Sequence, residues 1–170
     1  MALRVSGIEH SSKSSLREKI LEHLFVGELL RTLWLNRLYD VEIARPEVDN
    51  SGADLILVRG RIVRHIQLKS SGSTAKTARQ TLNLDLLSKP SGCVVWNVFD
   101  EETLMFENFL WYGANPGDPL PDITSFPIAL HTKGNAQGKK LERPNMRVIK
   151  KAQFTSIGTM ADLLVSLIGS

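Results

Sequence analysis

The sequence contains one cysteine, Cys93, among 170 residues. A single cysteine excludes an intrachain disulfide and any metal site built from several thiolates. Long apolar runs are also missing, because the longest nearly uncharged stretch, residues 103–132, contains three acidic residues and four prolines, so we expect no transmembrane helix. Residues 1–24 show no apolar core followed by a small-residue cleavage site. These absences favour a reducing, cytoplasmic location and exclude a membrane partner.

Neither sign of charge dominates the composition. The chain has 21 Lys+Arg and 18 Asp+Glu, which gives a formal net charge of +3. This value alone neither requires nor excludes a nucleic-acid partner. Hydrophobic residues at 42% and charged residues at 23% are ordinary for a globular domain and exclude a disordered or low-complexity chain. The length suits one domain over residues 1–170, with enough apolar side chains for a sizeable core.

The basic side chains concentrate in two blocks. Residues 59–80 contain six basic and no acidic residues, and residues 133–151 contain seven basic residues and one acidic residue. Between the blocks, residues 90–132 contain six acidic residues and no Lys or Arg. The two blocks could form one positive face that binds a polyanion, or two separate solvated surfaces that lack acids.

The predicted elements are a helix, a run of strands and a second helix. Ser15 followed by Glu18 is a capping box, and apolar residues recur after it at helical spacing. Alternating segments on either side of Arg59-Gly60 indicate a β-hairpin. We predict a helix over residues 16–38, strands over 41–45, 54–58, 61–68, 81–87, 93–99, 103–112, 126–131 and 146–149, loops over 70–77 and 133–143, and a closing helix over 157–168. This order predicts an α+β fold with a mixed sheet.

One acidic side chain of the first predicted helix stands out. At 100° per residue, Glu28 falls on the apolar stripe, whereas Glu18 and Glu22 fall on the polar side. A carboxylate that faces a core needs a partner. Glu28 is therefore a functional acid, one half of an ion pair with Arg17 or Arg31, or a residue at the edge of the stripe.

Two further candidates lie in the predicted hairpin. Asp54 opens the first strand directly after a turn, where an Asp often accepts hydrogen bonds from nearby backbone N–H groups. Gln67-Leu68-Lys69 ends the second strand, and alternation places Gln67 and Lys69 on one face and Leu68 on the other. Each feature is weak by itself, so any specificity comes from their order and spacing.

In this order, the three features resemble the PD-(D/E)xK nuclease superfamily, in the Mrr-like variant in which Gln replaces the acid of the third motif. The helix acid of the family corresponds to Glu28, the metal-binding Asp to Asp54, and the third motif to Gln67-Leu68-Lys69. The resemblance covers about residues 15–71. It implies a restriction-endonuclease-like core of the three-layer α/β kind, with a central mixed sheet flanked by an N-terminal and a C-terminal helix.

The resemblance also implies a chemistry. Mg²⁺ (or Mn²⁺) would be bound by the Asp54 carboxylate, the Gln67 side-chain oxygen and the main-chain carbonyl of Leu68, with Glu28 binding through a water or a second ion. Lys69 would orient or deprotonate the attacking water and pair with a phosphate oxygen. The implied activity is hydrolysis of phosphodiester bonds in DNA, in restriction or repair. Replacing an acidic ligand by Gln67 lowers the negative charge of the site by one and should weaken metal binding.

A DNA substrate would give the basic blocks a role. We expect eight basic residues to contact DNA phosphates: Arg61, Arg64, Lys76, Arg79, Lys139, Lys140, Arg143 and Arg147. Cutting both strands of a duplex would favour a two-fold homodimer, and no organic cofactor is expected. Two alternatives stay open. One is a catalytically inactive nuclease-fold module that binds nucleic acid or a protein partner, and the other is an unrelated α+β domain.

Two remaining residues have simpler interpretations. His65 alternates with Ile66 on a predicted inner strand, so we expect a structural role for it. Cys93 lies in an apolar strand, where a cysteine is usually a small buried hydrophobic residue and not a nucleophile.

Overall fold

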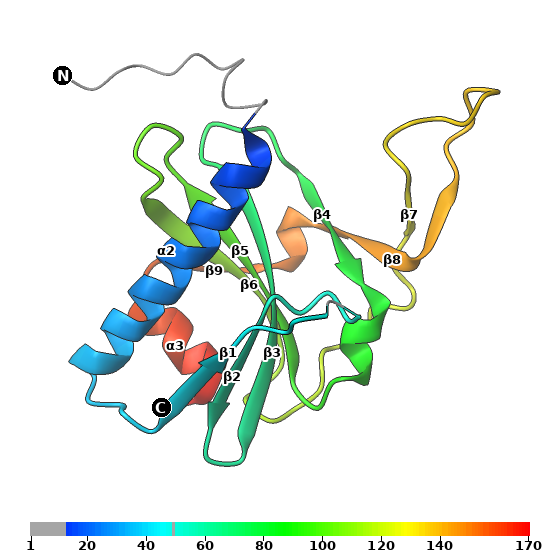
Figure 1. Cartoon of the computed structure of the whole chain (residues 1–170). Coiled ribbons are helices and arrows are strands. Elements are labelled where there is room, and N and C mark those ends of the chain that lie inside the picture. The colour runs from blue at the N-terminus through cyan, green and yellow to red at the C-terminus, as the bar shows by residue number, and fades with distance from the viewer. Residues whose placement is uncertain (1–12, 49) are drawn as a thin grey trace.

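A computed structural model describes residues 13–48 and 50–170. Within these residues the chain forms a six-stranded mixed sheet, a three-stranded antiparallel sheet and two α-helices, one near each end (Figure 1). The predicted α+β fold, with a central mixed sheet flanked by an N-terminal and a C-terminal helix, is confirmed. No helix among the described residues is long and apolar enough to cross a membrane.

The large sheet is antiparallel except at its centre. Its strands in spatial order are β1 (Val41–Ala44), β2 (Leu55–Arg59), β3 (Ile62–Gly72), β5 (Gly92–Phe99), β6 (Phe106–Gly113) and β9 (Thr155–Ile157). Only β3 and β5 run parallel. The connection between them passes through β4 (Arg79–Asn83) and the 3₁₀ helix η1 (Leu84–Ser88), because a parallel pair needs a crossover.

The small sheet joins the two basic blocks. It has the order β4, β8 (Glu142–Lys150) and β7 (Ile128–Leu130). The pairing of β4 with β8 sets Arg79 opposite Lys150, so residues far apart in the sequence become neighbours. The β7–β8 segment projects away from the rest of the molecule (Figure 1).

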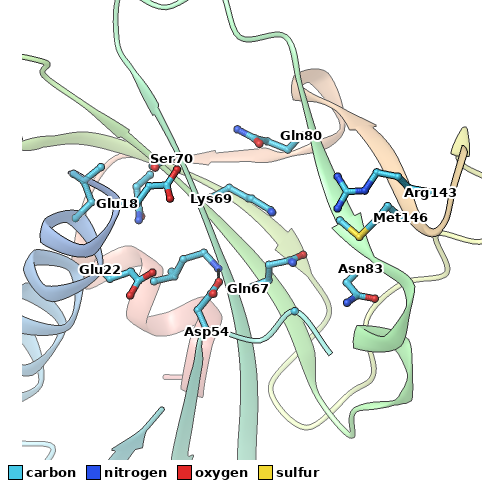
Figure 2. A pocket seen from close by; sticks show the side chains of 14 residues that line it. Glu18, Glu22, Asp54, Gln67, Lys69, Ser70, Gln80, Asn83, Arg143 and Met146 are labelled. Atoms are coloured by element: carbon cyan, nitrogen blue, oxygen red, sulfur yellow. Dashed lines mark hydrogen bonds between the residues drawn. The ribbon is translucent and has the colours of Figure 1, made fainter. Parts of the chain in front are cut away.

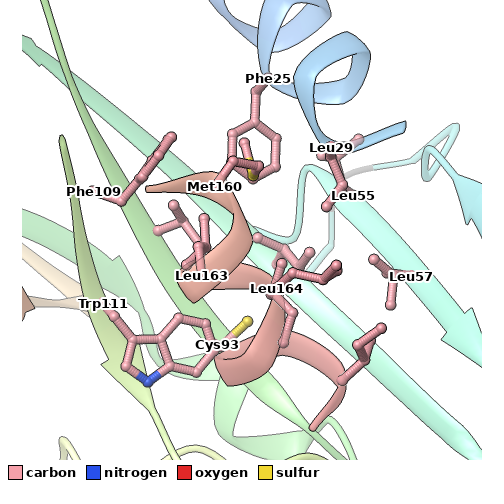
Figure 3. Close-up of a cluster of buried hydrophobic side chains, with 14 of the residues drawn as sticks. Phe25, Leu29, Leu55, Leu57, Cys93, Phe109, Trp111, Met160, Leu163 and Leu164 are labelled. Carbon is pink, nitrogen blue, oxygen red and sulfur yellow. The ribbon is translucent and has the colours of Figure 1, made fainter. Parts of the chain in front are cut away.

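Hydrophobic cores lie on both faces of the large sheet. On one face, α2 (Ser14–Leu35) and α3 (Met160–Ile168) pack together with side chains of β2, β5 and β6 (Figure 3). On the other face, Val94 and Trp96 of β5 pack with Leu82 and Ile149 of the small sheet. All eight residues of β5 are buried, as expected of a strand covered on both faces.

The ends of α2 differ from the prediction. The helix begins at Ser14, so Ser15 lies inside it, and the position before the helix is Lys13, which makes no side-chain capping bond. At the other end the helix stops at Leu35. Arg37 takes a left-handed φ of +58°, and the Leu38 N–H donates to the Leu33 carbonyl, a left-handed closure that ends the helix three residues early.

Other segments also differ from the prediction, among them the last long strand, which begins at Glu142 and not at Met146. The alternating leucines of residues 81–87 do not form one strand, because the Asn83 side chain accepts a hydrogen bond from the Asp85 N–H and starts η1. The polar segment 70–77 begins as strand, since its first three residues pair with β5. The closing helix begins at Met160, where Thr159 caps it, and β9 occupies the residues just before.

Candidate functional site

The two halves of β3 have different neighbours. Residues Ile62–Ile66 pair with β2 on one side. Residues 67–72 pair with β5 on the other side, and no described strand pairs with their second edge, because β2 begins only at Leu55. The second half of β3 therefore has an open edge in the middle of the molecule, which we call the open edge of β3.

A polar pocket of about 480 Å³ lies at this open edge. Its walls come from α2, the turn before β2, β3, β4, β5 and β8, so elements from most of the chain meet here (Figure 2). Asp54, Gln67, Leu68 and Lys69 all line it. The structure thus brings together three of the four catalytic residues expected from the sequence.

Asp54 lies directly before the first residue of β2 and caps the open edge. Its N–H donates to the Ile66 carbonyl at 2.8 Å, and its Oδ2 accepts the Leu68 N–H at 2.7 Å. In a β-strand the N–H and C=O of one residue point to the same side. The Leu68 carbonyl therefore faces the same edge as the Asp54 carboxylate.

Gln67, like Asn97 in the same pocket, has a buried side-chain oxygen without a hydrogen-bond partner. Gln67 is 4% exposed, and its Oε1 has no hydrogen-bond partner. Its amide packs on the backbone of Gly52, where an added Cβ would lie 2.6 Å from Gln67 Nε2. Gly52 also has a φ of +72°, so both space and backbone conformation require glycine there. A buried acceptor without a partner costs about 1–3 kcal/mol, which marks the pocket as a place for a ligand.

Alternation along β3 separates the three residues of the QxK motif. Leu68 packs against the core on the helix side, whereas Gln67 and Lys69 extend toward the small sheet (Figure 2). Arg143 of β8 extends into the pocket from the opposite wall (Figure 2). Two cationic side chains therefore face one polar cavity that also contains a carboxylate.

The structure does not bring Glu28 to this pocket. Its carboxylate forms a two-point ion pair with Arg31, at 2.7 Å and 3.1 Å, and lines a different pocket beside Leu24. The predicted stripe was misplaced because it included apolar residues such as Leu24 that are exposed. The ion pair with Arg31 was one of the interpretations that the sequence left open, and the assignment of Glu28 to the site is corrected.

α2 contributes two other acids, Glu18 and Glu22, to the pocket. Glu22 Oε2 accepts hydrogen bonds from Lys19 at 2.9 Å and from Arg45 at 3.0 Å, so two cations already neutralise it. Sequence reasoning passed over both acids because they lie on the polar side of the helix. Their position on the polar side could have identified them, because an acid on a helix reaches a water-accessible pocket from the polar side and not from the core side.

Arg64 was predicted to contact DNA, and this prediction is wrong. The residue is fully buried, and its guanidinium donates to the carbonyls of Leu167, Ala114 and Ser166 and to the Ser91 hydroxyl, at 2.7–3.0 Å. Burial lowers the pKa of this guanidinium from its ordinary value. Alternation along β3 places Arg64 on the same face as Ile66, which is the face that α3 covers. Its guanidinium therefore hydrogen-bonds the end of α3 and holds it against β3.

The other predicted DNA contacts lie in three places. Arg61 lies in the β2–β3 turn, about 26 Å along β3 from Lys69, and is therefore not part of the pocket. Lys76 and Arg79 line a surface groove together with Lys150 and Lys151. The remaining basic residues belong to the β7–β8 segment: Lys139 and Lys140 are exposed in its connection, Arg143 lines the pocket, and Arg147 donates to the carbonyls of Thr124, Pro144 and Met146.

Cys93 is fully buried, as the sequence predicted. Burial raises the pKa of its thiol to about 12, so the thiolate is negligible at neutral pH. Cys93 is therefore a core residue and not a nucleophile.

Within residues 13–48 and 50–170, no three side chains of His, Cys, Asp and Glu lie close enough to form a metal site. A cation in the pocket would therefore depend on amide and main-chain oxygens as well as on Asp54. No protein-family model and no curated protein sequence matches this chain.

Proposed function

We propose that the chain is a metal-dependent nuclease that hydrolyses phosphodiester bonds of DNA in the pocket at the open edge of β3. One observation carries the proposal: Asp54, Gln67 and Lys69 line a single pocket, in which the buried Gln67 Oε1 has no hydrogen-bond partner. These three residues match the order and spacing of the PD-(D/E)xK pattern in its QxK form.

The oxygen atoms of the pocket fit a hard divalent cation. Mg²⁺ or Mn²⁺ would be held by the Asp54 carboxylate, Gln67 Oε1 and the Leu68 carbonyl, which share the open edge. When bound, such a cation supplies charge neutralisation and lowers the pKa of a bound water. Glu18 adds negative charge on the α2 wall, whereas Glu22 is already paired with Lys19 and Arg45.

The protein's own cations would bind the substrate. Lys69 on β3 and Arg143 on β8 extend from opposite walls, so a phosphate in the pocket would accept hydrogen bonds from both (Figure 2). Lys69 would also hold the attacking water against the phosphorus, because a compact ammonium can donate to two oxygens at once. Asp54 keeps the Leu68 backbone in position through its 2.7 Å hydrogen bond.

The surface beside the pocket suits a nucleic acid. The β4–β8 pairing makes one basic groove from Lys76, Arg79, Lys150 and Lys151. The projecting β7–β8 segment carries Lys139 and Lys140 in its exposed connection (Figure 1). A major groove of DNA admits a two-stranded ribbon of this kind. We infer that this segment contacts the duplex while the groove binds its phosphates.

A second candidate is a nuclease-fold module that binds DNA without cleaving it. The specific observation in its favour is the neutral Gln67 at the position of an acid, combined with the lack of a three-acid cluster among the described residues. This candidate predicts DNA retention that is equal in EDTA and in Mg²⁺.

The test is cleavage of plasmid DNA with Mg²⁺ or Mn²⁺. We expect Lys69→Ala to lower the cleavage rate at least about 100-fold, in line with the loss of a group that acts in the transition state. Lys89→Ala removes the same charge from the turn before β5 and should leave the rate unchanged. If the wild-type protein cleaves no nucleic acid with either metal, the enzymatic proposal fails and the binding module stands.

A further inference from the structure

The outer side of α2 is apolar. Five large side chains of the helix, Leu16, Ile20, Leu24, Leu30 and Trp34, are 37–69% exposed. At 100° per residue they lie opposite the buried side of the helix, which packs on α3 and the sheet. We call these five residues, with Gly27 between them, the outer face of α2. A surface helix normally presents polar residues on this side, so an uncovered apolar face is unusual.

The apolar surface continues beyond the helix. Trp34 packs against Tyr39, with ring centroids 5.2 Å apart, and both rings are exposed, as is Leu35. These three residues and the other four large side chains average about half exposure. At about 200 Å² for each fully exposed large side chain, they offer roughly 800 Å², which is about what one partner buries in a stable protein interface.

The outer face is arranged symmetrically about Gly27. Leu24 and Leu30 lie three residues to either side of it, and Ile20 and Trp34 lie seven residues to either side. A Cβ built on Gly27 would meet no atom within 4 Å, so its missing side chain is not explained by packing within the chain. Glycine inside a helix costs about 1 kcal/mol relative to alanine, and it permits the close approach of a second helix.

The charged side chains on and beside the outer face are paired within the helix. Lys19 forms an ion pair with Glu22 at 2.9 Å, and Arg31 forms one with Glu28 at 2.7 Å. A covering partner would therefore not bury an unpaired charge. A helix that lies on a membrane usually has unpaired Lys and Arg along its border, and this helix does not fit that pattern.

We propose that the outer face of α2 packs against the same face of a second copy of this chain, antiparallel, with the two-fold axis at Gly27. In this arrangement Leu24 of each copy faces Leu30 of the other and Ile20 faces Trp34, while the exposed His23 faces Arg31, which stays paired with Glu28. The inference uses no residue of the proposed catalytic pocket and stands independently of the proposed function.

The first test is the mass of the protein in solution, measured by light scattering during size-exclusion chromatography. We expect the wild type to have twice the chain mass of 18.9 kDa, as a dimer. The double variant Leu30→Glu/Trp34→Glu should have the mass of a single chain. Val165→Glu places the same charge on an exposed apolar position of α3 and should remain dimeric. Circular dichroism checks that each variant is folded. A wild type that is monomeric at high micromolar concentration overturns the proposal.

The second test is disulfide cross-linking, which reports the geometry. Gly27→Cys should give a covalent dimer on mild oxidation, because the axis brings the two copies of this position together. Leu16→Cys should not, since its two copies lie at opposite ends of the interface. Cys93 does not interfere, because it is fully buried. Equal cross-linking of both variants would indicate parallel helices and contradict the proposal. A monomer that sediments with vesicles of phosphatidylcholine and phosphatidylserine would assign the face to a membrane surface and would overturn it too.

Discussion

Arg64 in the first half of β3 and Gln67 in the second half are buried polar side chains in opposite states. In the first half, which pairs with β2, the guanidinium of Arg64 donates to four acceptors. In the second half, which lacks β2, Gln67 is 4% exposed and its Oε1 has no partner. One strand thus contains both a fully satisfied and an unsatisfied polar group, only three residues apart.

This difference separates structural from functional polar residues. A buried group whose hydrogen bonds are all made within the protein stabilises the fold, because removing it leaves its partners unsatisfied. A buried group without a partner, in a pocket that also contains a carboxylate and a lysine, is placed for a ligand. The second environment exists because β2 begins only at Leu55 and pairs with β3 no further than Ile66.

The largest expected effect is on stability, and it tests the hydrogen bonds of Arg64. Arg64→Met removes the donors to three backbone carbonyls and Ser91, and leaves those acceptors buried, so we expect a loss of about 3–5 kcal/mol in the free energy of unfolding. Urea denaturation measures it. Arg61→Met, at the exposed β2–β3 turn, should change stability by less than about 0.5 kcal/mol. Equal effects of the two variants would contradict the structural role of Arg64.

The next prediction tests whether the unpartnered side chain of Gln67 belongs to a cation site. Gln67→Glu adds a buried carboxylate beside Asp54, so the metal-free protein should lose about 1–3 kcal/mol, while Mg²⁺ should bind about tenfold more tightly. Thermal melting in EDTA and in increasing Mg²⁺ measures both changes. Gln137→Glu introduces the same charge in the exposed β7–β8 connection as a control. If Mg²⁺ stabilises Gln67→Glu no more than the control, the cation site is wrong.

A smaller effect sharpens the contrast between Arg64 and the exposed cations. The double variant Lys139→Ala/Lys140→Ala should lower the slope of log K against log salt for DNA binding by about 2, since each lost phosphate contact removes about 0.9. Fluorescence anisotropy with a labelled duplex over a range of NaCl measures this slope. Lys13→Ala/Lys89→Ala removes the same charge elsewhere and should leave the slope as it is in the wild type. An unchanged slope in the first variant would remove the β7–β8 segment from the DNA interface.

The smallest effect concerns His65 in the first half of β3. Burial, followed by the nearby Lys89, lowers the pKa of His65 below its ordinary value of 6.5, and its Nδ1 is buried without a partner. The unfolded chain therefore binds this proton more readily than the folded chain. The contribution of His65 to the free energy of unfolding is fully present above about pH 6.5. It is lost as the pH falls from there through the pKa of His65 in the folded protein.

The free energy of unfolding measured across this pH range checks the prediction. His65→Gln should weaken the pH dependence, and His131→Gln, at an exposed position, should keep it as in the wild type. The same dependence in all three proteins would show that His65 is not the titrating group.

Local patterns predicted the elements that carry the site. The β2–β3 hairpin follows from alternation on either side of Gly60, whose φ of +58° suits the turn. Alternation also predicted that Gln67 and Lys69 share a side of β3, and the burial of Cys93 followed from its apolar strand. These are properties of neighbouring residues, which is why the sequence reveals them.

Other predictions were wrong because they concerned features that depend on which parts of the chain cover a surface. Glu28 was assigned to the site on the assumption that the apolar residues of α2 all face the core, but the outer face is apolar as well. Arg64 was taken as a surface cation because nothing local indicates that Ser91 and the end of α3 enclose it. β9 was missed because three residues become a strand only through pairing with β6.

The sequence by itself determined the α+β class, the order of the elements and the positions of Asp54, Gln67 and Lys69 along them, since spacing and periodicity are local. Only the tertiary structure decided that β2 begins opposite Ile66, which leaves Gln67 beyond it, and that Glu18 and Glu22 are the helix acids of the pocket. It also decided that the two basic blocks meet through β4 and β8. The physical reason is that these outcomes depend on strand pairing and burial between residues far apart in the chain.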